Sequence, residues 1–113
     1  MKLETLAGKT LYSAAVEVRE DTESYEEMVV LNKDLPAWNE LFTEKLGASM
    51  IVAGKQGIDD GSKIDTALAL AENYGGIGEG QTLYHGTYDS TEVLVLIWPW
   101  GNNVNVTLKK AIL

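Results

Sequence analysis

The segment TEVLVLIW, residues 91–98, is the stretch of sequence that decides the expected fold. From Val93 to Ile97 every side chain is apolar, so the alternation that marks a half-exposed strand is missing. A strand with this pattern usually lies inside a sheet that is covered on both faces. We therefore expect a central strand here, with helices or a second sheet layer on its far side.

Two more strands are expected beside this segment. Thr82 to Tyr88 precedes it across Asp89-Ser90, and Val104 to Lys109 follows it across the turn at residues 99–103. The last segment alternates between apolar and polar residues, which predicts one buried side and one solvent-facing side. Its expected inward residues are Val104, Val106 and Leu108, and its expected outward residues are Asn105, Thr107 and Lys109.

The amino-terminal part of the chain predicts a hairpin. Lys9 to Arg19 alternates along its length in the manner of a strand with one wet face. Glu20 to Ser24 is polar and suits a turn, and Tyr25 to Leu31 suits the returning strand. Neither Asn-Gly nor Asp-Gly marks the turn, although these pairs are common in tight hairpins.

The first helix is expected between Asp34 and Gly47. Asp34 can cap its start, Pro36 fits its first turn, and Gly47 suits its end. Trp38 and Phe42 lie on its apolar stripe, and for both we favour a place in the core over contact with a ligand.

The second helix is expected to begin near Ser62, with Asp65 completing a cap, and to end at Gly75-Gly76. A short strand, Ala48 to Ala53, is expected between the two helices. The resulting order is ββαβαβββ. It predicts a single α+β domain over residues 1–113, with a mixed or mainly antiparallel sheet and two helices packed on it.

The composition is that of a folded protein. The 113 residues are 45% hydrophobic and 23% charged, and there is no cysteine, which excludes disulfides and thiolate metal sites. The longest apolar run is Val93 to Trp100, well short of the roughly 20 residues that a membrane-spanning helix needs. Because the first residues also lack the apolar run of a secretion signal, we expect a soluble, cytoplasmic protein without membrane contact.

Negative charge is concentrated near the amino end. The net charge is −8, and between residues 17 and 27 a single base, Arg19, accompanies six acids. These acids are Glu17, Glu20, Asp21, Glu23, Glu26 and Glu27. A field of this sign repels nucleic-acid phosphates and favours basic surfaces. We therefore expect no direct binding to nucleic acid and predict a basic protein partner.

No segment of the sequence meets the requirements of a known catalytic or metal-binding motif. Residues 57–63 have the wrong order and spacing for a P-loop, and residues 76–80 follow an expected helix instead of a strand, unlike a dinucleotide fingerprint. His85 is the only histidine and alternates with Tyr84 and Tyr88 along an expected strand, which favours an ordinary strand histidine over a catalytic one. We expect no metal, no cofactor and no catalytic residue.

Trp98 and Trp100 flank Pro99 at the end of an expected strand. Two tryptophans at such a turn do not both fit easily into one core, and an exposed tryptophan is a frequent anchor in protein interfaces. The alternative, which we slightly favour, is that Trp100 folds back and seals the edge of the core.

Three functional hypotheses follow. The leading one is a non-enzymatic interaction module of the inhibitor, immunity-protein or nucleic-acid-mimic type, which binds its partner through the six acids, with Trp98 and Trp100 as candidate additional contacts. Its plain alternative is that the acids only aid solubility. The second hypothesis is an assembly subunit of a homo-oligomer or particle that uses Val104–Lys109 or Lys9–Arg19 as an unpaired edge strand. The third is a small ligand-binding domain or enzyme centred on His85, Tyr84 and Tyr88 beside the Gly75–Gly80 loop.

Overall fold

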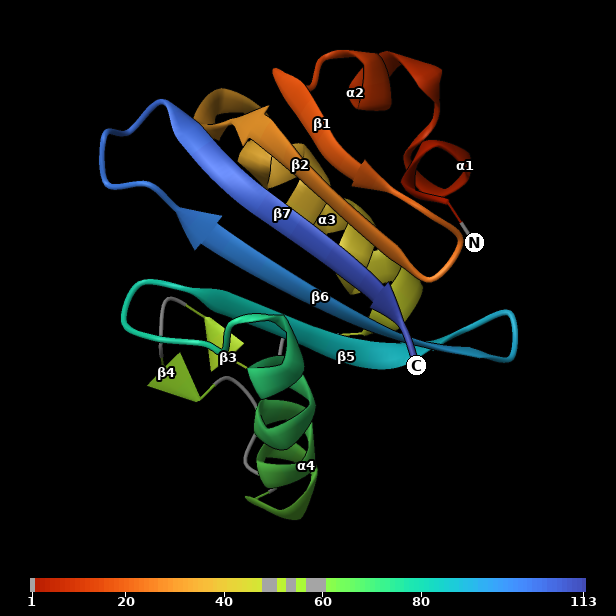
Figure 1. Cartoon of the computed structure of the whole chain (residues 1–113), viewed down its shortest axis with the longest axis vertical. Helices are drawn as coiled ribbons and strands as arrows, with labels where there is room; N and C mark the ends of the chain where they lie inside the picture. Colours follow the sequence, from red (N-terminus) through yellow and green to blue (C-terminus); the bar gives the residue numbers. More distant parts are fainter. Residues whose placement is uncertain (1, 48–50, 53–54, 57–60) are drawn as a thin grey trace.

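The computed structural model describes residues 2–47, 51–52, 55–56 and 61–113. The fold is α+β, with helices packed on an antiparallel sheet, as predicted (Figure 1). The strand order is β1-β2-β7-β6-β5-β3-β4, and each pair of neighbours runs antiparallel. The five longer strands are β1 (Glu17–Asp21), β2 (Tyr25–Leu31), β5 (Thr82–Tyr88), β6 (Thr91–Pro99) and β7 (Asn105–Ile112).

The first segment of the chain is helical, so the predicted strand from Lys9 to Arg19 is wrong over most of its length. α1 (Leu3–Ala7) and α2 (Lys9–Ser13) precede β1, which begins only at Glu17. Leu3, Ala7, Leu11 and Ala15 all pack into the core, and they recur every four residues. Leu3 and Ala7 are one helical turn apart in α1, and Leu11 in α2 has the same spacing to Ala15 just beyond its end, while Gly8, with φ 84°, separates the two helices. This spacing coexists with the alternation on which the strand prediction rested.

The hairpin between β1 and β2 is confirmed. Glu17 lies opposite Val29 and Asp21 lies opposite Glu26, with an irregularity in the register between Val18 and Glu20. Thr22 closes the turn, because its backbone N–H donates to the carbonyl oxygen of Tyr25 over 2.9 Å.

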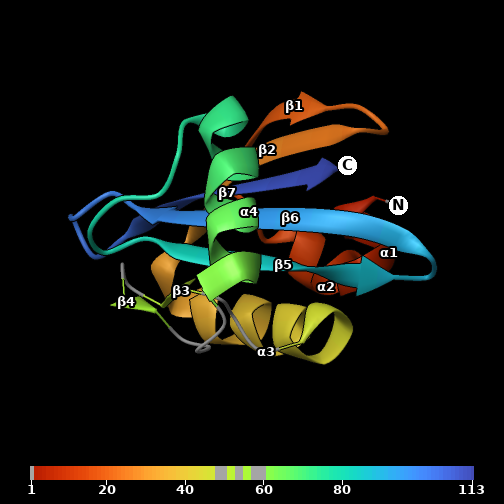
Figure 2. The ribbon, with the colours of Figure 1, turned by 90° about the horizontal axis from the view of Figure 1, so that it is seen from below.

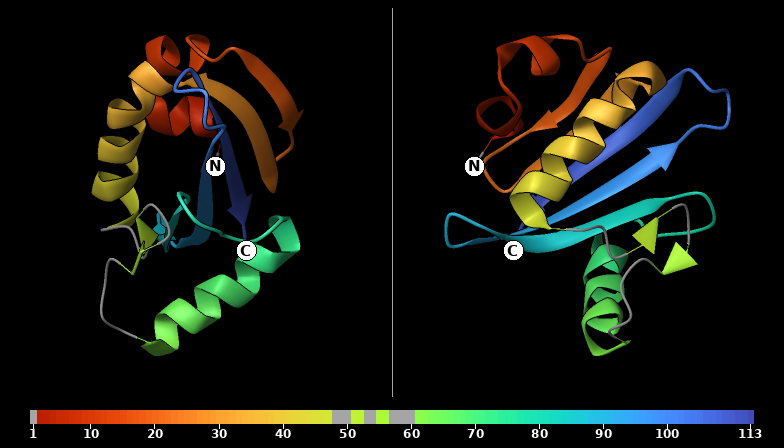
Figure 3. Two further views of the ribbon diagram at one scale, coloured as in Figure 1. Left: turned by 90° about the vertical axis from the view of Figure 1, so that its left-hand side faces the viewer. Right: turned by 180° about the vertical axis from the view of Figure 1, so that it is seen from behind.

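The first predicted helix is confirmed as α3 (Leu35–Leu46), which lies on one face of the sheet (Figure 3). Pro36 sits in its first turn, whereas Asp34 makes no side-chain capping bond and instead ends the 3-10 turn η1 (Asn32–Asp34). Trp38 and Phe42 are fully buried, with ring centroids 5.8 Å apart. Their predicted place in the core is therefore correct.

The second predicted helix is α4 (Gly61–Ala71), which crosses the opposite face of the sheet (Figure 2). Its Ala67 and Ala71 are fully buried in a cluster with Leu83, Leu94 and Leu96. The 3-10 turn η2 (Glu72–Tyr74) continues it to Gly75, which has the left-handed conformation expected of a terminating glycine. The predicted cap at Ser62 lies outside the described side chains.

The short strand expected at Ala48–Ala53 is represented by β3 (Ile51–Val52), which pairs with β4 (Lys55–Gln56) and with β5. Residues 48–50 and 53 lie outside the described part of the chain. The pair extends the sheet beyond β5.

The centre of the sheet holds β6 and β7. β6 is buried from Val93 to Ile97, as predicted. β7 differs from its prediction: it lies between β2 and β6 and is buried on both faces from Val106 to Ala111, while Val104 is exposed. The predicted outward residues Thr107 and Lys109 are therefore buried, and Val104–Lys109 is not an edge strand. The polar residues of β7 are accommodated because they find specific partners on both faces.

Candidate acidic interface

The predicted acidic surface is carried by the β1–β2 hairpin. All five residues of β1 are exposed, as is Glu23 in the turn, while Glu27 on β2 is half-buried. The register places acids opposite acids, Glu20 against Glu27 and Asp21 against Glu26. Like charges directly opposite one another on paired strands destabilise the pairing, so this hairpin carries negative charge at a cost in stability.

Basic residues offset part of this charge. The Lys2 ammonium lies 2.6 Å from the Asp21 carboxylate. The Arg19 guanidinium lies 3.2 Å from the Glu17 carboxylate and 3.9 Å from that of Glu27. Glu20 and Glu23 form no ion pair with any residue in the described part of the chain. These two carboxylates therefore contribute most directly to an outward negative field.

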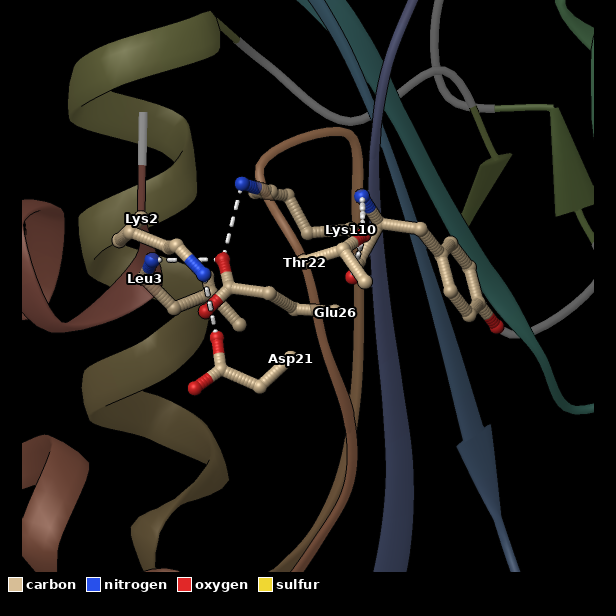
Figure 4. A network of polar contacts seen from close by, with 7 residues as sticks. Lys2, Leu3, Asp21, Thr22, Glu26 and Lys110 are labelled. Carbon is tan, nitrogen blue, oxygen red and sulfur yellow. Dashed lines mark hydrogen bonds and ion pairs between the residues drawn. The ribbon is translucent and has the colours of Figure 1, made fainter.

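Glu26 is not part of the exposed surface. Only 2% of this residue is accessible, and its carboxylate accepts the backbone N–H of Leu3 and lies 2.8 Å from the Lys110 ammonium (Figure 4). Lys110 is itself completely buried. The pair fastens the start of α1 to the central part of the sheet. Glu26 consequently has a structural role, and its prediction as a partner-binding residue is wrong.

Tyr25 fixes the other side of the hairpin. Its hydroxyl donates to the Glu27 carboxylate over 2.7 Å, and its ring stacks on that of Tyr74 with centroids 5.3 Å apart. Burial, followed by the hydrogen bond to the Glu27 side chain, raises the pKa of the Tyr25 phenol. Contacts on both faces of β2 thus hold the hairpin against the body of the protein.

A surface cavity of about 290 Å³ opens beside the hairpin, lined by Lys2, Glu4, Tyr12, Asp21 and Glu26. The hydrogen bond to Asp21 raises the pKa of the Lys2 ammonium, and burial followed by the charge of Asp21 raises the pKa of the Tyr12 phenol. The three carboxylates in its wall favour positive charge, and Lys2 already supplies one cation. Glu4, Tyr12 and Lys2 were not predicted as site residues, because nothing in the sequence signals that the first two helices pack beside the hairpin.

The two tryptophans have different environments. The Trp98 ring packs in the cluster beneath α4, with the Lys109 ammonium 3.4 Å from its centroid. The Lys109 ammonium also donates to the Tyr74 carbonyl over 2.8 Å, and burial lowers its pKa. Trp98 therefore belongs to the structure of the domain more than to an exposed surface.

Trp100 lies against the sheet while remaining 46% exposed. Its indole N–H donates to the Thr107 hydroxyl over 2.7 Å, and the Arg19 guanidinium lies 5.5 Å from its ring centroid. It thus combines both predicted roles, because it covers β7 and still presents aromatic surface. Arg19 links it to the acidic hairpin, which makes Trp100 the better candidate of the two for contact with a partner.

His85, Tyr84 and Tyr88 do not converge. The buried Tyr84 hydroxyl donates to the Asn39 side-chain oxygen over 2.8 Å on the α3 side of the sheet. His85 follows it on the strand and faces the other side, where its Nε2 lies 3.3 Å from the Glu92 carboxylate. The Lys45 ammonium lies 5.4 Å from the ring centroid of Tyr88. The arrangement of these three side chains gives no support to a shared ligand site.

Within the described residues there is no group of three or more histidine and acidic side chains placed to hold a metal ion. No helix in that part of the chain has the length and apolar character needed to cross a membrane. Comparison with protein families, curated proteins and solved structures found no match to this chain.

Proposed function

We propose that the chain is a non-enzymatic protein-interaction module that binds a basic partner through its β1–β2 hairpin. The interface consists of the exposed acids Glu17, Glu20, Asp21 and Glu23, with half-buried Glu27 and exposed Trp100 beside them. Acids in such a surface speed the encounter with an oppositely charged protein, and a tryptophan supplies a contact that holds the complex.

The observation that carries the proposal is the placement of acids directly opposite acids on the hairpin, with Glu20 facing Glu27 and Glu20 lacking a cation among the described residues. A hairpin selected for stability alone would gain by replacing Glu20, because Asp21 and Glu26 each have a lysine partner whereas Glu20 faces Glu27 without one. Residues that lower stability without a structural benefit are typical of functional surfaces. A basic partner would supply the missing counter-charge.

The test is capture of basic proteins from extracts of the source cells at increasing salt, followed by measurement of association rates with each purified protein. One variant combines Glu17→Gln, Glu20→Gln, Asp21→Asn and Glu23→Gln. The control combines Glu40→Gln, Glu44→Gln, Asp65→Asn and Glu79→Gln, four exposed acids outside the hairpin that change the net charge equally.

We expect the hairpin variant to associate at least tenfold more slowly at low salt and the control to associate nearly as fast as the wild type, because steering depends on local charge. An equal decrease of the association rate in the hairpin variant and in the control would show a nonspecific effect of net charge. Unchanged rates in both would remove the hairpin as the binding surface.

A further inference from the structure

We infer that the partner contributes an extended basic segment that adds to the sheet along β1. This inference rests on the proposed function and specifies how the same surface binds. The addition of a strand to a sheet edge gains affinity from backbone hydrogen bonds and specificity from alternate side chains.

β1 is an accessible edge of the sheet. It pairs with β2 on one side, and the described part of the chain places no strand on its other side. Figures 2 and 3 show β1 as the outermost strand, with α1 and α2 on the side of the sheet that carries α3. Val16 and Val18 are 56% and 44% exposed. The edge therefore offers both unpaired backbone and apolar side chains.

The hydrogen-bonding pattern identifies a backbone position that points outward. The Thr22 N–H donates to Tyr25, so these two residues form a hydrogen-bonded pair of the hairpin. Bonded and non-bonded pairs alternate along an antiparallel ladder. Asp21, which lies opposite Glu26, is the next residue along. Its N–H and C=O groups therefore point away from β2 and are available to an added strand.

The side chains of β1 specify the sequence of that strand. Glu17 and Glu20 share the face of Val29 and Glu27, while Val18 lies opposite Met28 on the other face. A strand added to β1 would meet Glu17 and Glu20 on one face. On the other face it would meet Val18 and Asp21, whose carboxylate is already paired with Lys2. Because side chains alternate between faces, the complementary segment alternates lysine or arginine with apolar residues.

The charge of the edge selects a basic segment over a second copy of this chain. Self-pairing through β1 would place Glu17, Glu20 and Asp21 beside the same acids of the other copy. Charged residues on an edge strand are a common protection against such pairing. A basic strand changes repulsion into attraction at the same positions.

The test uses the intact protein and two synthetic peptides. The first is an eight-residue peptide of alternating lysine and valine, and the second is the same peptide with every valine N-methylated. Both carry the same charge, but the second lacks the N–H groups needed for one side of a ladder. Binding is measured by titration calorimetry, and amide hydrogen exchange is followed at Asp21.

We expect the unmethylated peptide to bind at least tenfold more tightly, since two or three lost backbone hydrogen bonds are together worth about 1.4 kcal/mol or more. It should also slow exchange of the Asp21 amide, whereas the methylated peptide should not. Asp21→Pro should weaken binding of the unmethylated peptide more than Asp21→Ala, because both remove the carboxylate but only proline removes the N–H.

Equal binding of both peptides, weakened by neutralising the hairpin acids, would overturn strand addition and leave the proposed function intact. If binding does not depend on those acids, or if neither peptide binds, the result would count against both strand addition and the proposed function.

Discussion

The ion pair between Glu26 and Lys110 shows how much a single buried charge can constrain this fold. Both residues are buried, and their charged groups lie 2.8 Å apart. We expect Lys110→Met to lower the free energy of unfolding by about 3–5 kcal/mol, because it leaves a buried carboxylate without its counter-charge. Urea denaturation followed by circular dichroism measures the change.

The double variant Glu26→Gln with Lys110→Met is the matched control. The amide oxygen introduced at position 26 can still accept the Leu3 N–H, and neither position 26 nor position 110 then carries a buried charge. The double variant should therefore be more stable than Lys110→Met alone. The comparison also uses the single variant Glu26→Gln. If the double variant loses as much free energy of unfolding as the two single variants together, the two residues are not coupled, and the loss in Lys110→Met arises from packing.

Tyr25 should make stability depend on alkaline pH. Its phenol has a pKa raised by burial and by the hydrogen bond to Glu27. Below about pH 10 both the folded and the unfolded state keep the proton, so the full contribution is present. Above that pH the unfolded state releases the proton while the folded state retains it, and stability falls as pH rises.

Tyr25→Phe tests this by removing the titrating group. At neutral pH the variant should be less stable by about 1 kcal/mol, the typical value of one hydrogen bond. In urea denaturation between pH 8 and pH 11 the difference from the wild type should shrink as pH rises. Parallel stability curves across that range would contradict the assignment, since all other groups titrate alike in both proteins.

The sequence does not show which acids of the hairpin are exposed and which one, Glu26, is buried. Glu26 and Glu27 are neighbours with the same side chain, and the alternation of a strand separates them only by face. Which face is covered depends on α1, whose Leu3 supplies the N–H that Glu26 accepts. The acidic cluster was therefore predictable, whereas its division into structural and exposed members required the packing.

The contact between α3 and β5 depends on a glycine in the strand. A Cβ placed on Gly86 would collide with the backbone carbonyl of Leu46, the last residue of α3. We expect Gly86→Ala to lower the free energy of unfolding by about 1–3 kcal/mol, because backbone must move to admit the methyl group.

Gly78→Ala is the control for Gly86→Ala. A Cβ at Gly78 would meet only the Gln81 side-chain oxygen at an ordinary contact distance of 3.7 Å. This substitution should leave the denaturation midpoint nearly unchanged. If both substitutions lower the free energy of unfolding by a similar amount, the decrease in Gly86→Ala comes from the general effect of replacing glycine and not from contact with Leu46.

The elements that were predicted correctly carry local signals that agree with their environment. α3 has Pro36 at its start and an apolar stripe that is buried, and β6 has an apolar run that lies inside the sheet. The elements that were mispredicted carry two patterns at once or depend on distant partners. Residues 9–15 satisfy both a two-residue and a four-residue period, and β7 buries two lysines whose ammonium groups contact Glu26, Tyr74 and Trp98.

Across the whole molecule, the sheet joins a tightly packed centre to a charged edge. β6 and β7 bury apolar residues on both faces, whereas β1 is exposed along its length. A net charge of −8 implies repulsion among like charges within the folded state. The hairpin is where that repulsion is most localised, so stability and binding should respond there in opposite directions.

Glu20→Lys tests this opposition. The new ammonium would lie opposite Glu27 and replace a like-charge pair with an attractive one, so the free energy of unfolding should rise by about 0.2–1 kcal/mol. Association with a basic partner should slow at the same time, because the local field that steers it is reduced. Glu23→Lys changes the net charge equally but lies in the turn, outside the paired positions, and should slow association without the same gain in stability. A Glu20→Lys variant that is more stable and binds as fast as the wild type would show that the opposed acids serve no binding role, since the domain would then lose nothing by discarding them.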